Sequence, residues 1–142
     1  MNTPLRGAAL QRRACLLAML VAPAWGAQPE SDISLSAAMR RAEALRDEAL
    51  RAGDQAFGAA VLRGDHIVGA APSRVVTLGD PTAHAEMEAI RDAARQLGTR
   101  DLSGCILVST SRPCRMCEAA AAWAGISRMV HGQALTDAGV PR

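Results

Sequence analysis

Two short segments, DPTAHAE at residues 80–86 and PCRMC at residues 113–117, decide the fold and the chemistry of this chain. Together they supply one imidazole and two thiols, from His84, Cys114 and Cys117. Three nitrogen and sulfur ligands of this kind suit a catalytic zinc ion whose fourth position is open to water. The sequence therefore predicts a zinc site of the catalytic type.

Both segments carry residues that are typical of helix starts. Asp80 is a favourable N-cap and Pro81 suits the first helical position, while Pro113 has the same place in the second segment. The spacing of Cys114 and Cys117 places both thiols on one face of a first helical turn, where the helix dipole favours thiolates. We therefore expect one helix to begin at Pro81 and another at Pro113.

Glu86 follows His84 by two residues and is not needed as a ligand, so it is free to transfer protons. A lone His-x-Glu carries almost no information. A lone Cys-x-x-Cys is often a redox pair, half of a structural zinc knuckle or two ordinary buried thiols. The combination of both motifs, at two helix starts separated by a strand, is far more specific. It predicts a site that activates water against an electrophilic carbon.

The length of 142 residues corresponds to one domain, and four cysteines without regular spacing do not form a disulfide framework. Helical and strand patterns alternate, which predicts an α/β sheet with helices on its faces. Trp123, a single Trp on an Ala-rich helix, is expected to pack in the core. The predicted elements are a helix at 35–51, strands at 57–62 and 66–71, a helix at 81–97, a parallel buried strand at 105–110, a helix at 114–124 and a strand at 129–131.

Residues 1–27 have the order of a secretory signal peptide. Arginines precede the apolar run at 14–25, which ends in small residues and is too short to span a bilayer. The pair Arg12-Arg13 is also similar to a twin-arginine signal. We expect a periplasmic or secreted domain over residues 28–142, without a membrane span in its mature form. A cytoplasmic protein with an N-terminal extension is the alternative.

Charge argues against a nucleic-acid partner. The chain has 16 basic side chains, all of them Arg, and 14 acidic ones. Three of the arginines lie within residues 1–27, which leaves 13 basic and 14 acidic side chains in the predicted mature domain. Nucleic-acid-binding surfaces normally carry a basic patch, and no basic run remains in that domain. The expected partner is a small molecule.

From about Phe57 to Gly132, the chain resembles the zinc deaminases of the cytidine deaminase fold, whose signature is His-x-Glu followed by Pro-Cys-x-x-Cys. DPTAHAE is similar to the guanine and cytosine deaminase branch and also to bacterial tRNA adenosine deaminases. Trp123-Ala124 and Thr136-Asp137-Ala138 resemble guanine deaminases in particular. The resemblance implies a three-layer sandwich with a mixed central sheet and helices on both faces. It also implies a homodimer in which a partner segment closes the site.

The same resemblance assigns roles to residues. It implies that His84, Cys114 and Cys117 hold Zn²⁺ and that Glu86 is the proton shuttle. The backbone N–H of Ala85 is implied to hold a carbonyl of the base. The expected reaction is the hydrolytic deamination of a nucleobase, by attack of zinc hydroxide on the ring and release of ammonia.

Two further residues are expected to contact the substrate. Ser73 stands where the family usually has an Asn that binds the base or the ribose, and its shorter hydroxyl favours a free base over a nucleoside. Asp137 stands where guanine deaminases carry a base-contacting Asp, and a carboxylate suits the hydrogen-bond donors of guanine. The sequence therefore predicts a guanine-deaminase-like enzyme.

Other functions stay open. One alternative is a cytosine, nucleoside or tRNA adenosine deaminase. Another is a catalytically idle zinc-binding module, favoured by Ser73 and by Arg112, which stands where a Glu often precedes the Pro-Cys pair. The presence of Glu86 favours an enzyme, because a structural zinc site gains nothing from a carboxylate that is not a ligand.

Overall fold

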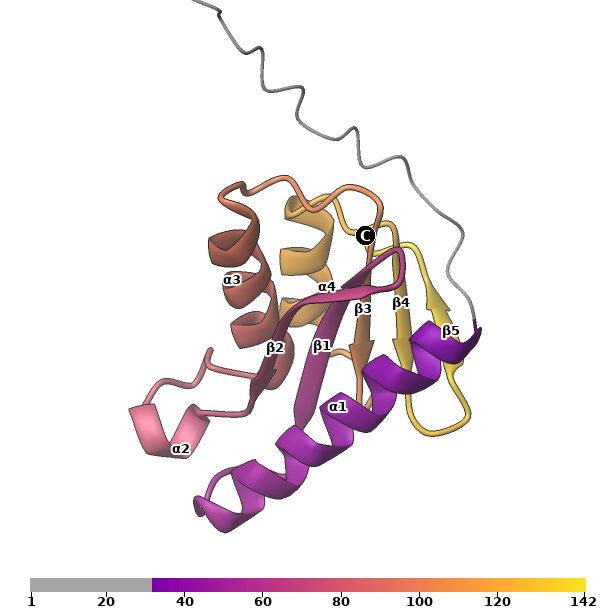
Figure 1. Ribbon diagram of the computed structural model, residues 1–142. Coiled ribbons are helices and arrows are strands. Elements are labelled where there is room, and N and C mark those ends of the chain that lie inside the picture. The colour runs from indigo at the N-terminus through magenta and orange to yellow at the C-terminus, as the bar shows by residue number, and fades with distance from the viewer. Residues whose placement is uncertain (1–31) are drawn as a thin grey trace, which may run out of the picture.

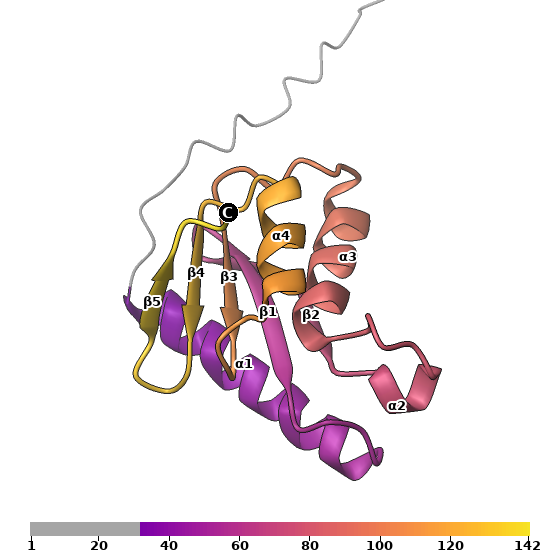
Figure 2. The same ribbon diagram turned by 180° about the vertical axis from the view of Figure 1, so that it is seen from behind.

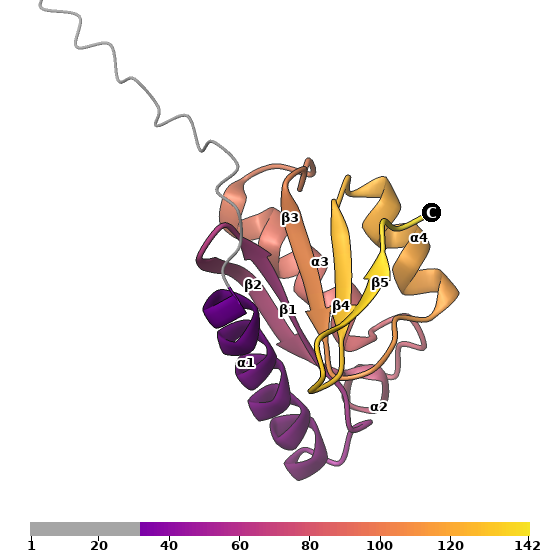
Figure 3. The same cartoon turned by 90° about the vertical axis from the view of Figure 1, so that its right-hand side faces the viewer.

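The computed structural model describes residues 32–142, which form three layers (Figures 1 and 3). Helix α1 (Asp32–Arg51) covers one face of a five-stranded sheet. Helices α3 (Ala85–Leu97) and α4 (Arg115–Trp123) lie side by side on the other face, as Figure 2 shows. The expected α/β sandwich with helices on both faces is confirmed. The predicted signal peptide lies outside the described residues.

The sheet is mixed, with strand order β2-β1-β3-β4-β5. Its central strand, β3, pairs antiparallel with β1 and parallel with β4. The prediction of a parallel sheet around this strand was therefore right on one side only. α4 supplies the crossover that a parallel pair requires. The strands span Gly58–Arg63 (β1), His66–Pro72 (β2), Cys105–Ser109 (β3), Arg128–His131 (β4) and Thr136–Gly139 (β5).

Each face of the sheet has its own apolar core. The stripe on α1 that includes Leu35, Met39 and Ala42 packs on residues such as Ile106 and Val108. On the opposite face, the buried residues of α3 are small, at Ala85, Ala89 and Ala93, apart from Glu86.

Small residues let α3 approach the sheet closely. A Cβ on Gly69 of β2 would lie 2.4 Å from the backbone nitrogen of Ala93 and 2.7 Å from the carbonyl oxygen of Ala89. Because nothing larger than Gly fits between these backbones, Gly69 permits the close approach of α3 to β2.

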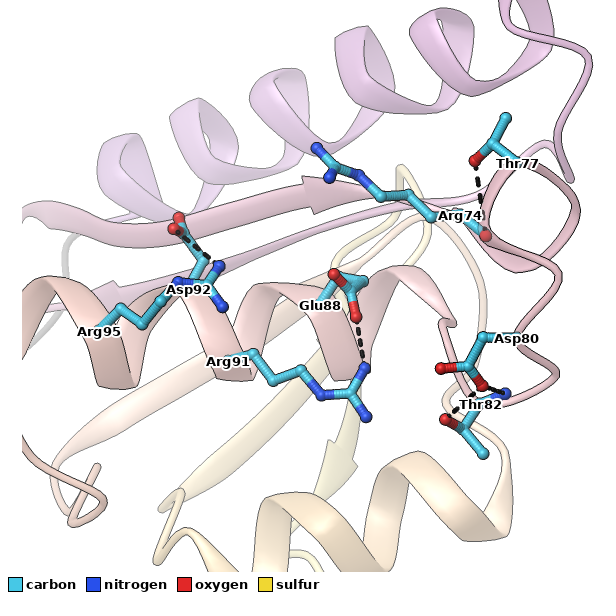
Figure 4. Close-up of polar contacts among 8 residues, drawn as sticks. All are labelled: Arg74, Thr77, Asp80, Thr82, Glu88, Arg91, Asp92 and Arg95. Carbon is cyan, nitrogen blue, oxygen red and sulfur yellow. Dashed lines mark hydrogen bonds and ion pairs between the residues drawn. The ribbon is translucent and has the colours of Figure 1, made fainter.

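The expected helix start at Pro81 is wrong. The carboxylate of Asp80 accepts hydrogen bonds of 2.8 and 2.7 Å from the backbone and hydroxyl of Thr82, which closes a local turn (Figure 4). Asx turns of this kind compete with helix formation. The helix therefore begins at Ala85 and His84 is its N-cap, while its end at Leu97 and Gly98 is as expected.

The helix predicted at residues 114–124 is confirmed to within one residue at each end, since α4 spans Arg115–Trp123, but the expected start at Pro113 and the burial of Trp123 are wrong. The N-cap of α4 is Cys114, and Pro113 precedes it. The buried residues of the helix are Cys117 and Ala121, one turn apart. Trp123 follows Ala121 by two residues and so points to the opposite side of the helix, where it is 91% exposed.

Two elements were not predicted. The short helix α2 (Val75–Leu78) lies between β2 and α3, and β5 forms an edge of the sheet beside β4. Both are short and lack an apolar period, which is the main signal for secondary structure in a sequence. Among the helices of residues 32–142, none is both long and apolar enough to cross a membrane.

Candidate metal centre and active site

Two helix starts place the predicted ligands. His84 is the N-cap of α3 and Cys114 is the N-cap of α4, and both have an extended backbone. Neither side chain makes a capping hydrogen bond, so both are available to a metal ion. Cys117 lies one turn into α4 and is buried, whereas Cys114 is exposed.

The three ligand atoms form a compact triangle. His84 Nδ1 lies 3.8 Å from the Sγ of Cys114 and 3.7 Å from the Sγ of Cys117, and the two sulfurs are 3.7 Å apart. Within residues 32–142, these atoms form a group of metal-binding type. The structure therefore brings together the three ligands that the sequence predicted.

The triangle fits zinc. With Zn–S near 2.3 Å and Zn–N near 2.0 Å, a tetrahedral ion spaces two sulfurs by about 3.8 Å, and a sulfur and a nitrogen by about 3.5 Å. The observed separations of 3.7 to 3.8 Å are close to these values. Since three ligands leave a fourth tetrahedral position, the site has the composition of catalytic rather than closed structural zinc.

Glu86 lies beside this triangle without belonging to it. Its side chain is buried in the first turn of α3, and its Oε2 lies 3.7 Å from the Sγ of Cys117. Burial raises the pKa of the Glu86 carboxyl above its usual value. Its own backbone N–H, the His84 imidazole and the Cys117 thiol act in the opposite direction but do not cancel the effect of burial. A carboxyl group whose pKa is raised in this way holds a proton more readily than an ordinary carboxyl group, and it can still accept one when ionised.

Burial also raises the pKa of the Cys117 thiol, and the Glu86 carboxylate and Cys114 add to the effect. Two thiols and a carboxylate packed this closely cannot all be ionised without a compensating cation. A divalent ion bound to the triangle would provide that compensation and favour the thiolate forms.

Ala85 is the first residue of α3 and is buried between His84 and Glu86. N–H groups in a first helical turn have no carbonyl partner within the helix, and they lie at the positive end of its dipole. Ala85 therefore contributes an N–H at the positive end of α3, next in sequence to His84, and its role in holding a carbonyl oxygen stays a prediction.

Ser73 is engaged in a structural contact. Its buried hydroxyl donates a 2.9 Å hydrogen bond to Oδ1 of Asp54. The following residue, Arg74, donates its backbone N–H to the carbonyl of Ala83, at 2.9 Å, next to the ligand His84. Ser73 is thus linked to the segment before His84 through the backbone bond of its neighbour Arg74, while its hydroxyl is directed at Asp54.

Asp137 is not in contact with the predicted zinc ligands. It lies on β5, exposed, where its carboxylate accepts hydrogen bonds of 2.9 Å from Arg128 and 2.7 Å from the backbone of Gly139. The hydrogen bond from the Gly139 backbone lowers the pKa of the Asp137 carboxyl, Arg128 adds to this effect, and burial opposes it.

Asp54, whose carboxylate binds Ser73 and the start of α2, was not predicted from the sequence. It follows the end of α1 and resembles an ordinary loop acid in the sequence. The cavity beside Cys114 that Arg112, Arg115 and Arg142 line was not predicted either. No local pattern signals either feature, because both depend on segments that meet only in the folded chain.

Residues 33–133 match the family described as the cytidine and deoxycytidylate deaminase zinc-binding region, and the chain belongs to this family. The chain is 39% identical over 101 residues to the guanine deaminase of Bacillus subtilis (strain 168), a match that covers 70% of this chain and 65% of that protein. The X-ray structure of guanine deaminase from Bacillus subtilis has a TM-score of 0.65 and 37% identity over 68% of this chain and 62% of its own.

Two further similarities are to proteins whose names refer to tRNA. A structure described in a study of tRNA:A34 deaminases has a TM-score of 0.66 and 33% identity, over 68% of this chain and 70% of its own. The chain is also 45% identical over 106 residues to a tRNA(Ile)-lysidine synthase of Deinococcus radiodurans. That match covers 74% of this chain and 18% of the synthase, so the chain spans only a small part of that relative.

Proposed function

We propose that the protein is a zinc-dependent hydrolase that removes an exocyclic amino group from a nucleobase and releases ammonia. The observation that carries this proposal is Glu86, a buried carboxyl that is not a ligand and lies 3.7 Å from one sulfur of the triangle. Membership of the deaminase family supports it. A purely structural zinc site has no use for such a group, which costs free energy to bury.

In this proposal His84, Cys114 and Cys117 hold the ion. When bound in such a site, zinc lowers the pKa of a coordinated water to about 7, far below that of bulk water, which provides a nucleophile at neutral pH. Glu86 accepts the proton that water gives up, passes it to a ring nitrogen and assists the departure of ammonia. The raised pKa of its carboxyl supports this double role, because the group must exist in both protonation states.

We propose guanine as the base. The Ala85 N–H at the start of α3 is a donor for the ring carbonyl, which guanine has and adenine lacks. The similarity to the guanine deaminase of Bacillus subtilis supports this choice. Asp137 still has acceptor capacity for the donors of guanine, since two contacts use about half of the lone pairs of a carboxylate.

The test is an ammonia-release assay of the zinc-loaded protein with guanine, cytosine, adenine and their nucleosides. The proposal predicts turnover of at least one compound, with guanine the fastest of the free bases. A protein that binds one zinc per chain, yet releases no ammonia from any of them, would be the idle binding module instead. The similarity to a structure from a study of tRNA:A34 deaminases favours one other substrate, tRNA adenosine. A tRNA substrate therefore belongs in the same assay.

Export and assembly are further parts of the proposal. The order of charged, apolar and small residues in residues 1–27 supports export to the periplasm or beyond. N-terminal sequencing of the natural protein is expected to find a start between residues 25 and 28, and an intact Met1 would exclude cleavage. We also propose a homodimer, as the family resemblance implies, with the 91% exposed Trp123 of α4 as a candidate contact because Trp is enriched at protein interfaces. Light scattering of the purified protein tests this assembly.

A further inference from the structure

A cavity of about 500 Å³ opens beside the metal centre. Cys114, the exposed ligand of the triangle, forms part of its wall, so the cavity and the metal centre share a boundary. Volumes of this size are typical of pockets for small ligands. The residues that line it are Arg112, Pro113, Cys114, Arg115, Glu118 and Arg142.

The lining is strongly basic. Three guanidinium groups face one carboxylate, that of Glu118. The three arginines come from the loop before α4, from its first turn and from the segment after β5. The ion pairs seen among residues 32–142 involve other arginines, so Glu118 is the one carboxylate side chain of the lining that offsets these three charges, and a net positive charge remains.

The position of Arg115 adds to this unbalanced charge. It is the first residue of α4, at the positive end of the helix dipole, where a cation is disfavoured and an anion is favoured. Guanidinium groups also match the geometry of phosphate oxygens, which they can bind in pairs. The cavity therefore has the chemistry of an anion site, adjacent to the site of the proposed deamination.

We infer that this cavity binds the phosphate of the substrate, so that the base is presented as a purine nucleoside monophosphate. This inference rests on the proposed function, which it extends from a free base to a nucleotide. The phosphate takes no part in the chemistry: water replaces the amino group on the ring, ammonia leaves, and the phosphate ester is unchanged.

A mononucleotide fits the observations better than a nucleic acid strand does. The cavity is local, with a volume of about 500 Å³, and the predicted mature domain has almost balanced charge, with 13 basic and 14 acidic side chains. Strand binding requires a basic surface that follows several phosphates.

The first test compares guanosine 5′-monophosphate with guanosine on the zinc-loaded protein. We expect kcat/KM for the nucleotide to exceed that for the nucleoside at least about tenfold, an advantage that falls as salt is added. Arg112→Gln with Arg115→Gln is expected to reduce the ratio towards one. Arg95→Gln, which removes the same type of charge from the last turn of α3, is the control and leaves the ratio unchanged.

The second test measures binding without turnover. In Glu86→Gln protein, calorimetry is expected to show tighter binding of the nucleotide than of the nucleoside, again only while Arg112 and Arg115 are present. Turnover of guanine without any nucleotide preference in either test would overturn the anion site and leave the proposed function standing. Arginine-dependent nucleotide binding in a zinc-loaded protein that deaminates nothing would support the site and reject the function.

An oligonucleotide is the competing ligand in both tests. A single-stranded RNA could displace the nucleotide, bind more tightly and show a steep salt dependence that the two Arg→Gln changes reduce. In that case the cavity binds a nucleic acid, and the mononucleotide inference is wrong. If inorganic phosphate binds equally well to the double variant and the unaltered protein, the cavity is not an anion site.

Discussion

The hydroxyl of Ser73 donates a 2.9 Å hydrogen bond to Oδ1 of the buried Asp54. Oδ1 also accepts from the backbone of Gln55, and Oδ2 accepts from the backbones of Val76 and Thr77 and from the Thr77 hydroxyl. One carboxylate thus joins the end of α1 to the segment that contains Ser73 and α2. The backbone bond from Arg74 to Ala83 extends this connection to the residue before His84.

Asp54→Ala is expected to reduce the free energy of unfolding by about 2 kcal/mol, because it leaves several donors without their acceptor. Urea denaturation measures this change. Ser73→Ala, which removes one hydrogen bond of the same network, is the matched control and is expected to cost about 1 kcal/mol. Equal stability of Asp54→Ala and the unaltered protein would show that water replaces the carboxylate without loss.

The same carboxylate predicts a loss of stability in acid. Burial acts to raise the pKa of Asp54, but hydrogen bonds from Thr77, Gln55 and Ser73 outweigh it and lower the pKa to about 2 from 3.8. Since the folded pKa is the lower one, the stabilisation is complete above the unfolded pKa and is lost as the pH falls from about 4 to about 2. Asp54→Asn is expected to show a weaker decline in unfolding free energy over this range, and an identical decline would contradict the assignment.

Glu86→Gln is expected to retain zinc and to lose turnover by a factor of about 10² or more, because the amide cannot accept and return a proton. Metal analysis and ammonia release measure the two effects separately. Glu88→Gln is a suitable control, since Glu88 lies on the same helix but pairs with Arg91 (Figure 4). Near-normal turnover in Glu86→Gln would disprove the proton-transfer role.

Cys117→Ser is expected to lose both the metal and a large part of the stability, because zinc binding contributes directly to folding where buried thiols depend on it. Thermal unfolding with and without a chelator measures the effect. Cys105→Ser is the control: its thiol is also buried, but it accepts a 3.3 Å contact from Arg63 and lies outside the triangle. A chelator that lowers the melting temperature of Cys117→Ser as much as that of the unaltered protein would argue against this residue as a ligand.

Guanine is expected to be turned over about 10³-fold faster than cytosine or adenine. A difference of this size is typical when the protein forms hydrogen bonds to polar groups that the competing substrate lacks. Asp137→Ala is expected to narrow this difference, and Arg128→Gln, which removes the other half of the ion pair, is the control. Faster turnover of cytosine than of guanine would overturn the choice of base while leaving the metal chemistry intact. If the preference for guanine is unchanged in Asp137→Ala, Asp137 does not contact the base and only pairs with Arg128.

The sequence by itself determined the ligand types, the general position of the helices and strands, and the presence of a carboxyl that is not a ligand. These follow from short-range spacing: His84 and Glu86 are two residues apart, and Cys114 and Cys117 are one helical turn apart. The layered α/β fold followed from the alternation of helical and strand periods, which depends only on neighbouring residues.

Only the tertiary structure decided how distant segments meet. It placed His84 and Cys114 at the N-caps of two helices. For His84 the reason is the turn that Asp80 closes, which delays the start of α3. It also turned Trp123 outwards and gathered Arg112, Arg115 and Arg142 around one cavity. Such contacts depend on which face each helix presents and on how closely it approaches the sheet. The exposed face of a helix and its distance from the sheet are set by the packing of side chains on residues that are far apart in the sequence.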